Sequence, residues 1–287
     1  MRAVNTEITY LAPGSFINRR FVAPGIEVNT GTYETYPVTI RDGRPIKDEF
    51  NLDTQGFVLA EHRSAVADFS DRQQVDTLYT DEVSEIVKAL TGADKVVQRG
   101  WMVRTSGELK KRKVEGYTHS SGVQPPASEA HVDYMPDCAE QIAATLYRES
   151  FAGAPPYSRF IAASLWRAFS EPPQDWPLAL CDGRSVGPDE GTPNALIIVD
   201  ELPDREAMLD DIWEQKTVVT AAIFPYSPEH RWWYFSGMRR DEVVLLKFHD
   251  SDPKKTMRVP HTAFHDTSFA DARPRQSIEV RTFAYFL

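Results

Sequence analysis

The sequence is poor in cysteine. Cys138 and Cys181 are the only two cysteines among its 287 residues. They are too few for the disulfide framework of a small secreted domain. The start of the chain, Met1–Glu7, also has no apolar core of the kind found in signal peptides. We therefore expect a reduced, intracellular protein that is located in the cytoplasm.

Long apolar runs and an excess of positive charge are also missing. No run approaches the roughly 20 apolar residues that a membrane-crossing helix needs, so we expect no membrane partner. Lysine and arginine total 32 against 42 aspartate and glutamate residues, which gives a formal net charge of −10. Because nucleic acids are bound largely through cations on phosphate, this balance argues against a nucleic-acid partner. The sequence gives no signal for the oligomeric state.

Apolar residues, in contrast, are plentiful. They make up 41% of the chain, and a chain of 287 residues is long enough to bury a sizeable core. We expect one domain, residues 1–287, in which residues 1–72 form a β-rich extension. This extension is expected to pack on a core formed by residues 73–287.

Short β-prone segments, separated by Pro, Gly and Asp turns, recur along the chain. The expected strands are Tyr36–Arg41, Phe57–Ala60, Val96–Arg104, Arg159–Trp166, Leu178–Cys181, Asn194–Val199, Val218–Phe224, Trp232–Phe235, Glu242–Phe248 and Ser277–Phe286. The first of them ends at Asp42-Gly43, which predicts a hairpin turn. So many strands among so few helices favour an all-β sandwich or barrel core.

Two segments have helical spacing. In Asp81–Leu90 the apolar residues recur every three or four positions, with Thr80 as the expected cap and Gly92 as the expected end. Pro136–Ser150 has a similar apolar side. Between them, the polar segment 107–126 holds the basic run Lys110–Lys113, which we interpret as a solvated loop, with a lid as the alternative.

A possible metal site lies in the run Ala130–Tyr134. His131 and Asp133 are two residues apart, so in an extended segment they point from the same face. A third ligand is available at His261, which follows Pro260 and precedes a short apolar run. Two imidazoles and one carboxylate are the protein ligands of non-haem Fe(II) oxygenases. The alternative for His131 is a hydrogen-bonded core histidine, and His249 and His265 are rivals of His261.

A possible carboxylate clamp follows His261 in the sequence. Arg275 and Ser277 are two residues apart and share a face if the segment is a strand. Together they can bind one carboxylate, the arginine through its planar fork and the serine through its hydroxyl. Beside an iron site, this pair suggests 2-oxoglutarate as the cosubstrate. Arg281 is the alternative clamp, and surface ion pairs are the alternative explanation of both arginines.

Other polar and aromatic residues are candidates for the wall of a substrate pocket. Trp166 and Arg167 are such candidates. The alternative for Arg167 is a structural role, in which it pairs with Asp182 or another acid. The aromatic run Trp232–Tyr234 is expected to belong to the core of a strand.

The sequence resembles the hydroxylase/desaturase family of secondary metabolism, which includes an aspergillic-acid hydroxylase, a fungal gibberellin desaturase and a cephamycin 7α-methoxylation protein. The resemblance runs from about Phe57 to the C-terminus. It is strongest in Phe57–Leu59 with Ser64 and Asp68-Phe69, in His131–Asp133, in Leu165–Arg167 with Trp176–Asp182, in Trp233–Phe235 through Met238, Asp241–Val243 and Lys247–Ser251, and in Pro260–Phe264 with Pro274–Arg281.

This resemblance implies a double-stranded β-helix of the jelly-roll or cupin-like type with flanking helices. It also implies an Fe(II)- and 2-oxoglutarate-dependent oxygenase that uses O2 on a C–H bond of a small metabolite. His131, Asp133 and His261 are implied as iron ligands, and Arg275 with Ser277 as the 2-oxoglutarate clamp. Two positions depart from the family pattern, Ala168 where proline is usual and His249 where tyrosine is frequent.

Two other functions fit the same residues. One is a non-catalytic accessory protein of the same fold, which would release no succinate. The other is a cupin-like metal enzyme that needs no keto acid, against which the Arg275/Ser277 pair argues. The sequence does not identify the substrate, and it does not separate hydroxylation from desaturation or ring closure.

Overall fold

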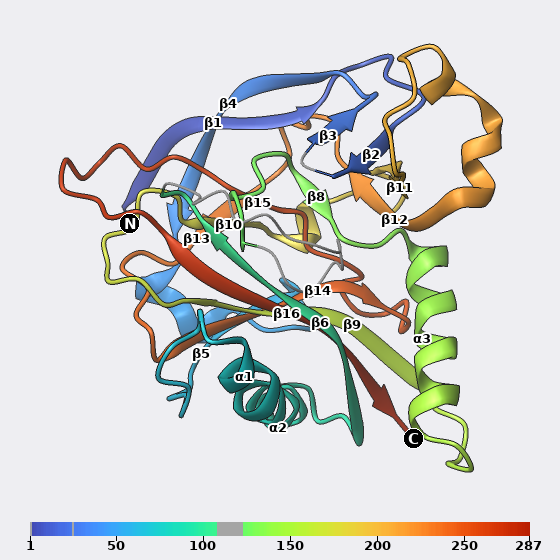
Figure 1. Ribbon diagram of the computed structural model, residues 1–287. Coiled ribbons are helices and arrows are strands. Elements are labelled where there is room, and N and C mark those ends of the chain that lie inside the picture. Colours follow the sequence, from blue (N-terminus) through green and yellow to red (C-terminus); the bar gives the residue numbers. More distant parts are fainter. Residues whose placement is uncertain (1, 25, 108–122) are drawn as a thin grey trace.

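Two facing β-sheets make up most of the molecule, with helices at its periphery (Figure 1). The computed structural model describes residues 2–24, 26–107 and 123–287. The basic run Lys110–Lys113 therefore lies outside the described residues. The expected mainly-β class is confirmed, because sixteen strands form in the described part of the chain.

The larger sheet has ten strands. Their order is β1 (Ala3–Leu11), β4 (Tyr33–Asp42), β13 (Trp232–Tyr234), β10 (Leu178–Cys181), β15 (His261–Ala263), β8 (His131–Val132), β12 (Thr217–Ile223), β11 (Thr192–Ile198), β2 (Arg19–Ala23) and β3 (Ile26–Asn29). Most neighbours are antiparallel, but β13 with β4 and β11 with β2 are parallel pairs.

The smaller sheet has six strands. Their order is β5 (Phe57–Glu61), β14 (Glu242–Asp250), β9 (Arg159–Ala168), β16 (Gln276–Phe286), β6 (Lys95–Thr105) and β7 (Val123–Gln124). Every residue of β14 is buried, as expected for a strand that is covered on both faces. One face packs against the larger sheet, since the main apolar cluster contains Phe248 and Phe283 from this sheet and Leu180 and Trp232 from the other.

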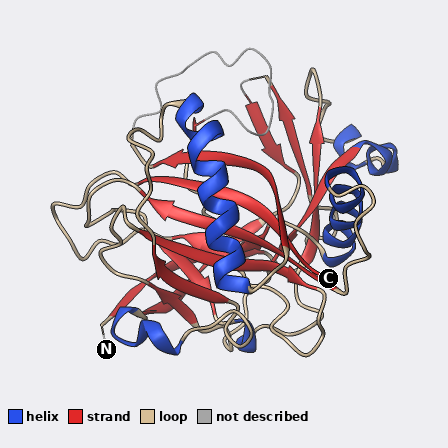
Figure 2. Ribbon diagram, turned by 90° about the horizontal axis from the view of Figure 1, so that it is seen from below, coloured by secondary structure: helices blue, strands red, loops and turns tan. Residues whose placement is uncertain are grey.

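The second face of the six-stranded sheet is covered by a helical segment, which lies across it in Figure 2. The segment comprises α1 (Arg72–Gln74), a π-helical turn η2 (Val75–Tyr79) and α2 (Thr80–Thr91). Val83 and Val87 of α2 belong to the same apolar cluster as Ile278 and Val280 of β16. Apolar residues at this spacing form one stripe, and burying that stripe against the sheet stabilises the helix.

The remaining helices are α3 (Pro136–Ser150), whose predicted bounds are confirmed, and four short 3₁₀ segments. These are η1 (Arg44–Glu49), η3 (Gly183–Ser185), η4 (Ala207–Leu209) and η5 (Asp211–Lys216). No helix in the described ranges is long and apolar enough to cross a membrane.

Two local predictions are wrong. Asp42-Gly43 does not close a hairpin, because β4 pairs with β1 and β13 and the chain continues into η1. Thr80 does not cap a helix, because the helical segment already starts after Asp71, whose side chain accepts the first free amides. The end at Gly92 is confirmed, and its φ of +74° is of the left-handed kind that glycine favours.

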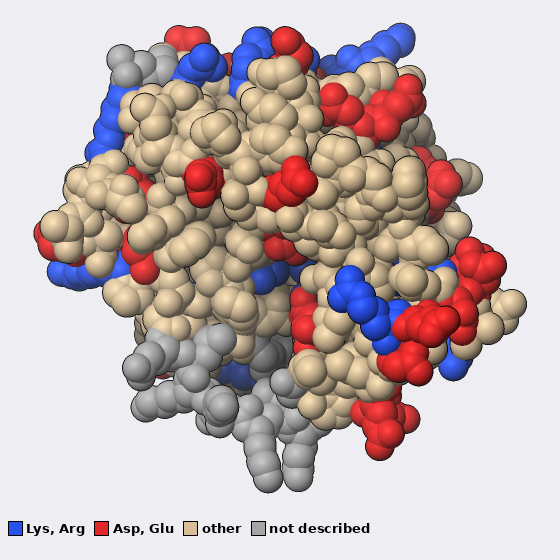
Figure 3. Space-filling model, turned by 90° about the horizontal axis from the view of Figure 1, so that it is seen from above, with Lys and Arg blue, Asp and Glu red and all other residues tan. Residues whose placement is uncertain are grey.

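The first 72 residues contribute strands to both sheets. β1 to β4 extend the ten-stranded sheet at its two ends, and β5 forms an edge of the six-stranded sheet. The division into an extension and a core stays a prediction. Figure 3 shows one face of the molecule, on which charged side chains are scattered and some basic atoms are recessed near the centre.

Candidate metal centre

Two short neighbouring strands bring His131 and His261 together. They stand opposite each other in the register of β8 and β15, and their ring centroids are 4.4 Å apart. Asp133 follows β8 directly, and its Oδ1 lies 3.5 Å from Nε2 of His131 and 3.9 Å from Nε2 of His261. One ligand atom from each of the three side chains lies within 4.8 Å of the others. The expected convergence of these residues is therefore present.

Both imidazoles present the same nitrogen to this cluster. Nδ1 of His131 lies 2.8 Å from the carbonyl oxygen of Glu129, and Nδ1 of His261 lies 3.2 Å from that of Val259. A carbonyl oxygen can only accept a hydrogen bond, so these contacts favour a proton on Nδ1 and a free lone pair on Nε2. This is the way in which metal-binding histidines are usually oriented by their surroundings.

Charge and burial also prepare these groups for a cation. Burial, reinforced by the neighbouring His131, lowers the pKa of His261 to about 4, so this ring is neutral near pH 7. Burial works to raise the pKa of Asp133, but the charge of Arg281 and the two histidines outweigh it and hold that pKa well below its usual value. For His131, burial is outweighed by Asp133, which raises the pKa of the imidazole.

The two rival histidines lie elsewhere. Nε2 of His249 is 3.2 Å from Oε1 of Glu140 on α3, and the ring of His265 stacks on Trp176 at a centroid distance of 5.1 Å. Within the part of the chain that the structure describes, the cluster with metal-binding geometry is that of His131, Asp133 and His261.

Arg281 lies beside this cluster rather than at a distance from it. Its Nε donates to Oδ2 of Asp133, and its Nη2 donates to Oε1 of Glu279 at 3.2 Å. Both ends of the guanidinium are thus bound to acids. The geometry therefore does not favour Arg281 as the clamp for a keto acid, and it gives Arg281 the role of holding Asp133.

Arg275 and Ser277 are differently placed, because both are buried and neither side chain is fully bonded. Nη1 of Arg275 donates to the carbonyl of Trp176 at 2.9 Å, while its Nε and the Ser277 hydroxyl have no hydrogen-bond partner among the described residues. Burial, with repulsion by Arg104, lowers the pKa of Arg275 to about 9. A buried cation with free donors is costly, and a bound carboxylate would remove that cost.

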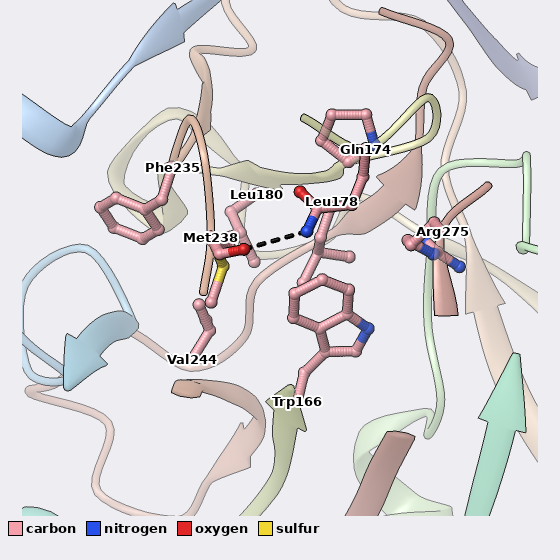
Figure 4. A pocket seen from close by; sticks show the side chains of 9 residues that line it. Trp166, Gln174, Leu178, Leu180, Phe235, Met238, Val244 and Arg275 are labelled. Carbon is pink, nitrogen blue, oxygen red and sulfur yellow. Dashed lines mark hydrogen bonds between the residues drawn. The ribbon is translucent and has the colours of Figure 1, made fainter. Parts of the chain in front are cut away.

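A small cavity adjoins Arg275 (Figure 4). Its lining is largely apolar and includes Trp166, whose ring lies 5.7 Å from the guanidinium carbon of Arg275. Trp166 thus packs against the proposed clamp. Ala168, where the family pattern usually has proline, stands opposite Ser277 in the register of β9 and β16.

The expectation for Arg167 requires a correction. It stands next to Trp166 on β9, and successive side chains of a strand point to opposite faces. Its guanidinium is buried under the helical segment, where it donates to the Tyr79 hydroxyl at 3.0 Å, to the carbonyl of His62 at 2.9 Å and to the carbonyl of Arg240. This placement favours the structural alternative for Arg167, although its partners among the described residues are these groups and not Asp182 or another acid.

A second, larger cavity adjoins the metal cluster and was not predicted from the sequence. Its volume is about 780 Å³, and His131, Asp133 and Arg281 belong to its lining. The remaining lining comes from strands at the far end of the ten-stranded sheet, from β6, from residues 124–129 and from Tyr134. These residues carry no recognisable motif, and they become neighbours only when the two sheets close.

Comparisons with known proteins agree with this geometry. A family model described as "Oxidoreductase/YMDC permease-like domain" matches residues 8–285. An Fe(II)/2-oxoglutarate-dependent dioxygenase, nvfI of Aspergillus novofumigatus, is 32% identical over 91% of this chain and 87% of its own. The hydroxylase/desaturase efuI of Hormonema carpetanum is 31% identical over 99% and 95%.

The fold agrees as well. A solved structure of the iron and alpha-ketoglutarate-dependent endoperoxidase NvfI superposes with a TM-score of 0.80 at 28% identity, and covers 99% of this chain and 98% of that one. The expected double-stranded β-helix is thus confirmed. The chain belongs to the family of Fe(II)/2-oxoglutarate-dependent dioxygenases and hydroxylases/desaturases.

Proposed function

We propose that this chain is an Fe(II)- and 2-oxoglutarate-dependent oxygenase in which His131, Asp133 and His261 hold the iron. Arg275 and Ser277 bind the far carboxylate of 2-oxoglutarate. The observation that supports this best is the convergence of three ligand atoms within 4.8 Å of one another, with a buried and incompletely bonded arginine nearby.

The residues fit the two groups. The Nε2 atoms of two imidazoles and one carboxylate oxygen are ligands that suit ferrous iron and would leave room for 2-oxoglutarate and O2. When bound, these groups together supply an oxidant that takes hydrogen from a C–H bond, while 2-oxoglutarate becomes succinate and CO2. The protein's part is to orient the substrate and keep out competing reactions.

The surrounding side chains have supporting roles. Arg281 holds Oδ2 of Asp133, so that Oδ1 stays directed at the histidines. Trp166 closes one side of the Arg275 pocket, and the cavity of about 780 Å³ receives a small-molecule substrate next to His131. The reaction is a hydroxylation, a desaturation or an oxidative ring closure at a C–H bond of that molecule.

The non-catalytic alternative is less well supported. An accessory protein has no need of three converging ligands with free Nε2 atoms, and the similar proteins carry the names of dioxygenases and hydroxylases/desaturases. We further propose a location in the cytoplasm, which cell fractionation with an antibody to the chain would test.

The proposal is tested by adding Fe(II) and then 2-oxoglutarate to the protein without oxygen. We expect a visible charge-transfer band that needs both additions, and no such band in Asp133→Ala. Circular dichroism of that variant would show that its fold is intact. Succinate release by Asp133→Ala at the wild-type rate would refute the assignment of Asp133.

A further inference from the structure

The large cavity has two walls of different chemistry. One wall comes from the ten-stranded sheet and is mostly apolar, with Val22, Leu196, Val219, Ala221 and Ile223. The other comes from β6 and β16 and presents three arginines, Arg99, Arg104 and Arg281. A volume of about 780 Å³ is in the usual range for pockets that enclose a drug-sized molecule.

A β-bulge directs Arg99 to this cavity. The register of β6 and β16 shifts between Val280 and Thr282, which pair with Trp101 and Gln98. Arg281 alone therefore faces both Arg99 and Gly100, and Gly100 has a φ of +81°. Bulges next to active sites commonly re-aim a side chain, and here the bulge lies opposite the arginine that holds Asp133.

The arginines of the cavity differ in their partners. Arg20 lies 2.7 Å from Glu27, Arg104 lies 3.3 Å from Glu279, and Arg281 binds Asp133 and Glu279. Arg99 instead donates to the Tyr134 hydroxyl at 3.3 Å, with its guanidinium carbon 5.7 Å from the centre of that ring.

Among the described residues, no acid lies within ion-pair distance of Arg99. The Tyr134 hydroxyl accepts from Arg99 and keeps its own proton, so it can donate to the same ligand. Glu129 also lines the cavity without an ion pair in the described ranges, but it lies close enough to Tyr33 to contribute to the raised pKa of that phenol. Within the described part of the chain, Arg99 is thus a cation without an acidic partner next to the proposed metal site.

Asn194 shows independently that this cavity is built for a polar ligand. Asn194 is only 5% exposed, it lines the cavity, and its Oδ1 meets no hydrogen-bond donor in the part of the chain that the structure describes. It stands opposite Ala221, two residues from Ile223, which in turn stands opposite His131. A buried acceptor without a donor is unfavourable, so a ligand that donates to it is favoured.

We propose that Arg99, together with Tyr134, binds an anionic group of the substrate. The substrate is an organic acid with a bulky apolar body, which lies on the wall formed by Leu196, Val219 and Ile223. A hydroxyl or amide of that body donates to Asn194. This inference rests on the proposed function, because it identifies the cavity next to His131 as the substrate site.

A matched pair of fluorescent probes tests the anion site. The anionic 8-anilinonaphthalene-1-sulfonate and the neutral N-phenyl-1-naphthylamine share one apolar body. Both are titrated into the protein, with and without Mn(II) and N-oxalylglycine to occupy the proposed metal and 2-oxoglutarate sites. We expect the wild type to prefer the anionic probe, and Arg99→Gln to reduce that preference by about tenfold or more. Its affinity for the neutral probe should stay unchanged.

Two further variants make the result specific. Arg99→Lys keeps the charge and should retain part of the preference, while Arg205→Gln, at an exposed arginine outside the cavity, should retain all of it. An unchanged preference in Arg99→Gln, or an equal loss in Arg205→Gln, would overturn the proposal. Such a result, alongside a normal charge-transfer band, would leave the oxygenase assignment standing and remove only the acidic substrate.

Discussion

Two arginines that are six residues apart have different environments: Arg275 directly precedes β16, and Arg281 lies within it. Arg275 is buried with free donors, whereas Arg281 is bound by two acids next to the metal cluster. We expect Arg275→Met to weaken 2-oxoglutarate binding about 10- to 100-fold, because it removes a charge-assisted hydrogen bond to the carboxylate. Iron binding should remain. Titration of 2-oxoglutarate into the anaerobic Fe(II) protein measures the effect.

Arg281→Met should weaken metal binding and leave the 2-oxoglutarate clamp in place. Without its contact, Oδ2 of Asp133 loses the group that orients it, and changes in such supporting contacts typically weaken metal binding about 10- to 100-fold. Co(II) titration followed by visible absorption gives the affinity without turnover. If Arg281→Met instead bound Co(II) normally and 2-oxoglutarate poorly, the roles of the two arginines would have to be exchanged.

At this scale the sequence was informative where side-chain spacing alone sets direction. His131 and Asp133 share a face because they are two residues apart, and so do Arg275 and Ser277. The same rule places Arg167 on the outer face of β9 once Trp166 is known to point into the barrel. Which of Trp166 and Arg167 points inward depends on the register with β16, and this is fixed by contacts between distant segments.

Among the elements, α3 and β9 could be predicted from the sequence, whereas β15 could not. α3 and β9 carry enough apolar residues to show their period, and their predicted positions agree with the structure. β15 has three residues and no pattern of its own, and it exists because β10 and β8 pair with it on either side. The metal cluster thus depends on strands that are too short to be recognised alone.

Two glycines with positive φ, which lie at the boundaries of elements, give a matched test of backbone strain with and without a steric clash. A Cβ on Gly92, after α2, would meet nothing within 4 Å, while a Cβ on Gly56, before β5, would lie 2.5 Å from Val259. We expect Gly92→Ala to cost about 1 kcal/mol of unfolding free energy, from backbone strain alone. Gly56→Ala should cost about 2 to 4 kcal/mol, because overpacking adds to that strain. Urea denaturation of both variants checks this, and equal costs would contradict the role of the contact with Val259.

For the whole molecule, the site is a product of sheet closure. His131 and His261 come from the larger sheet, whereas Arg275 and Arg281 come from just before the start and from the middle of β16, an inner strand of the smaller sheet. The bulge that directs Arg99 to the cavity is a shift in the pairing of β6 with β16. Gly100 is the one residue there whose type indicates such a bulge in the sequence. Residue spacing and the family resemblance together indicated the ligand set, but the cavity and Arg99 could be recognised only in the three-dimensional structure.

Buried histidines should make the stability of the metal-free protein depend on pH. Burial lowers the pKa of His62, with help from the charge of Arg167, and burial also lowers the pKa values of His249 and His261. A histidine in the unfolded chain has a pKa near 6.5. Below that pH these histidines therefore bind protons in the unfolded chain that they do not bind in the folded protein. Stability from these three groups is present above about pH 6.5 and is lost as the pH falls.

His131 acts in the opposite direction, because Asp133 raises its pKa and its contribution is lost as the pH rises. Since three histidines oppose one, we expect the free energy of unfolding to fall by about 1 kcal/mol or more between pH 7.5 and pH 5.5. Urea denaturation in the presence of EDTA measures this difference, and His62→Gln should make the dependence shallower. A free energy that stayed constant or rose over that range would contradict the lowered pKa values of His62, His249 and His261.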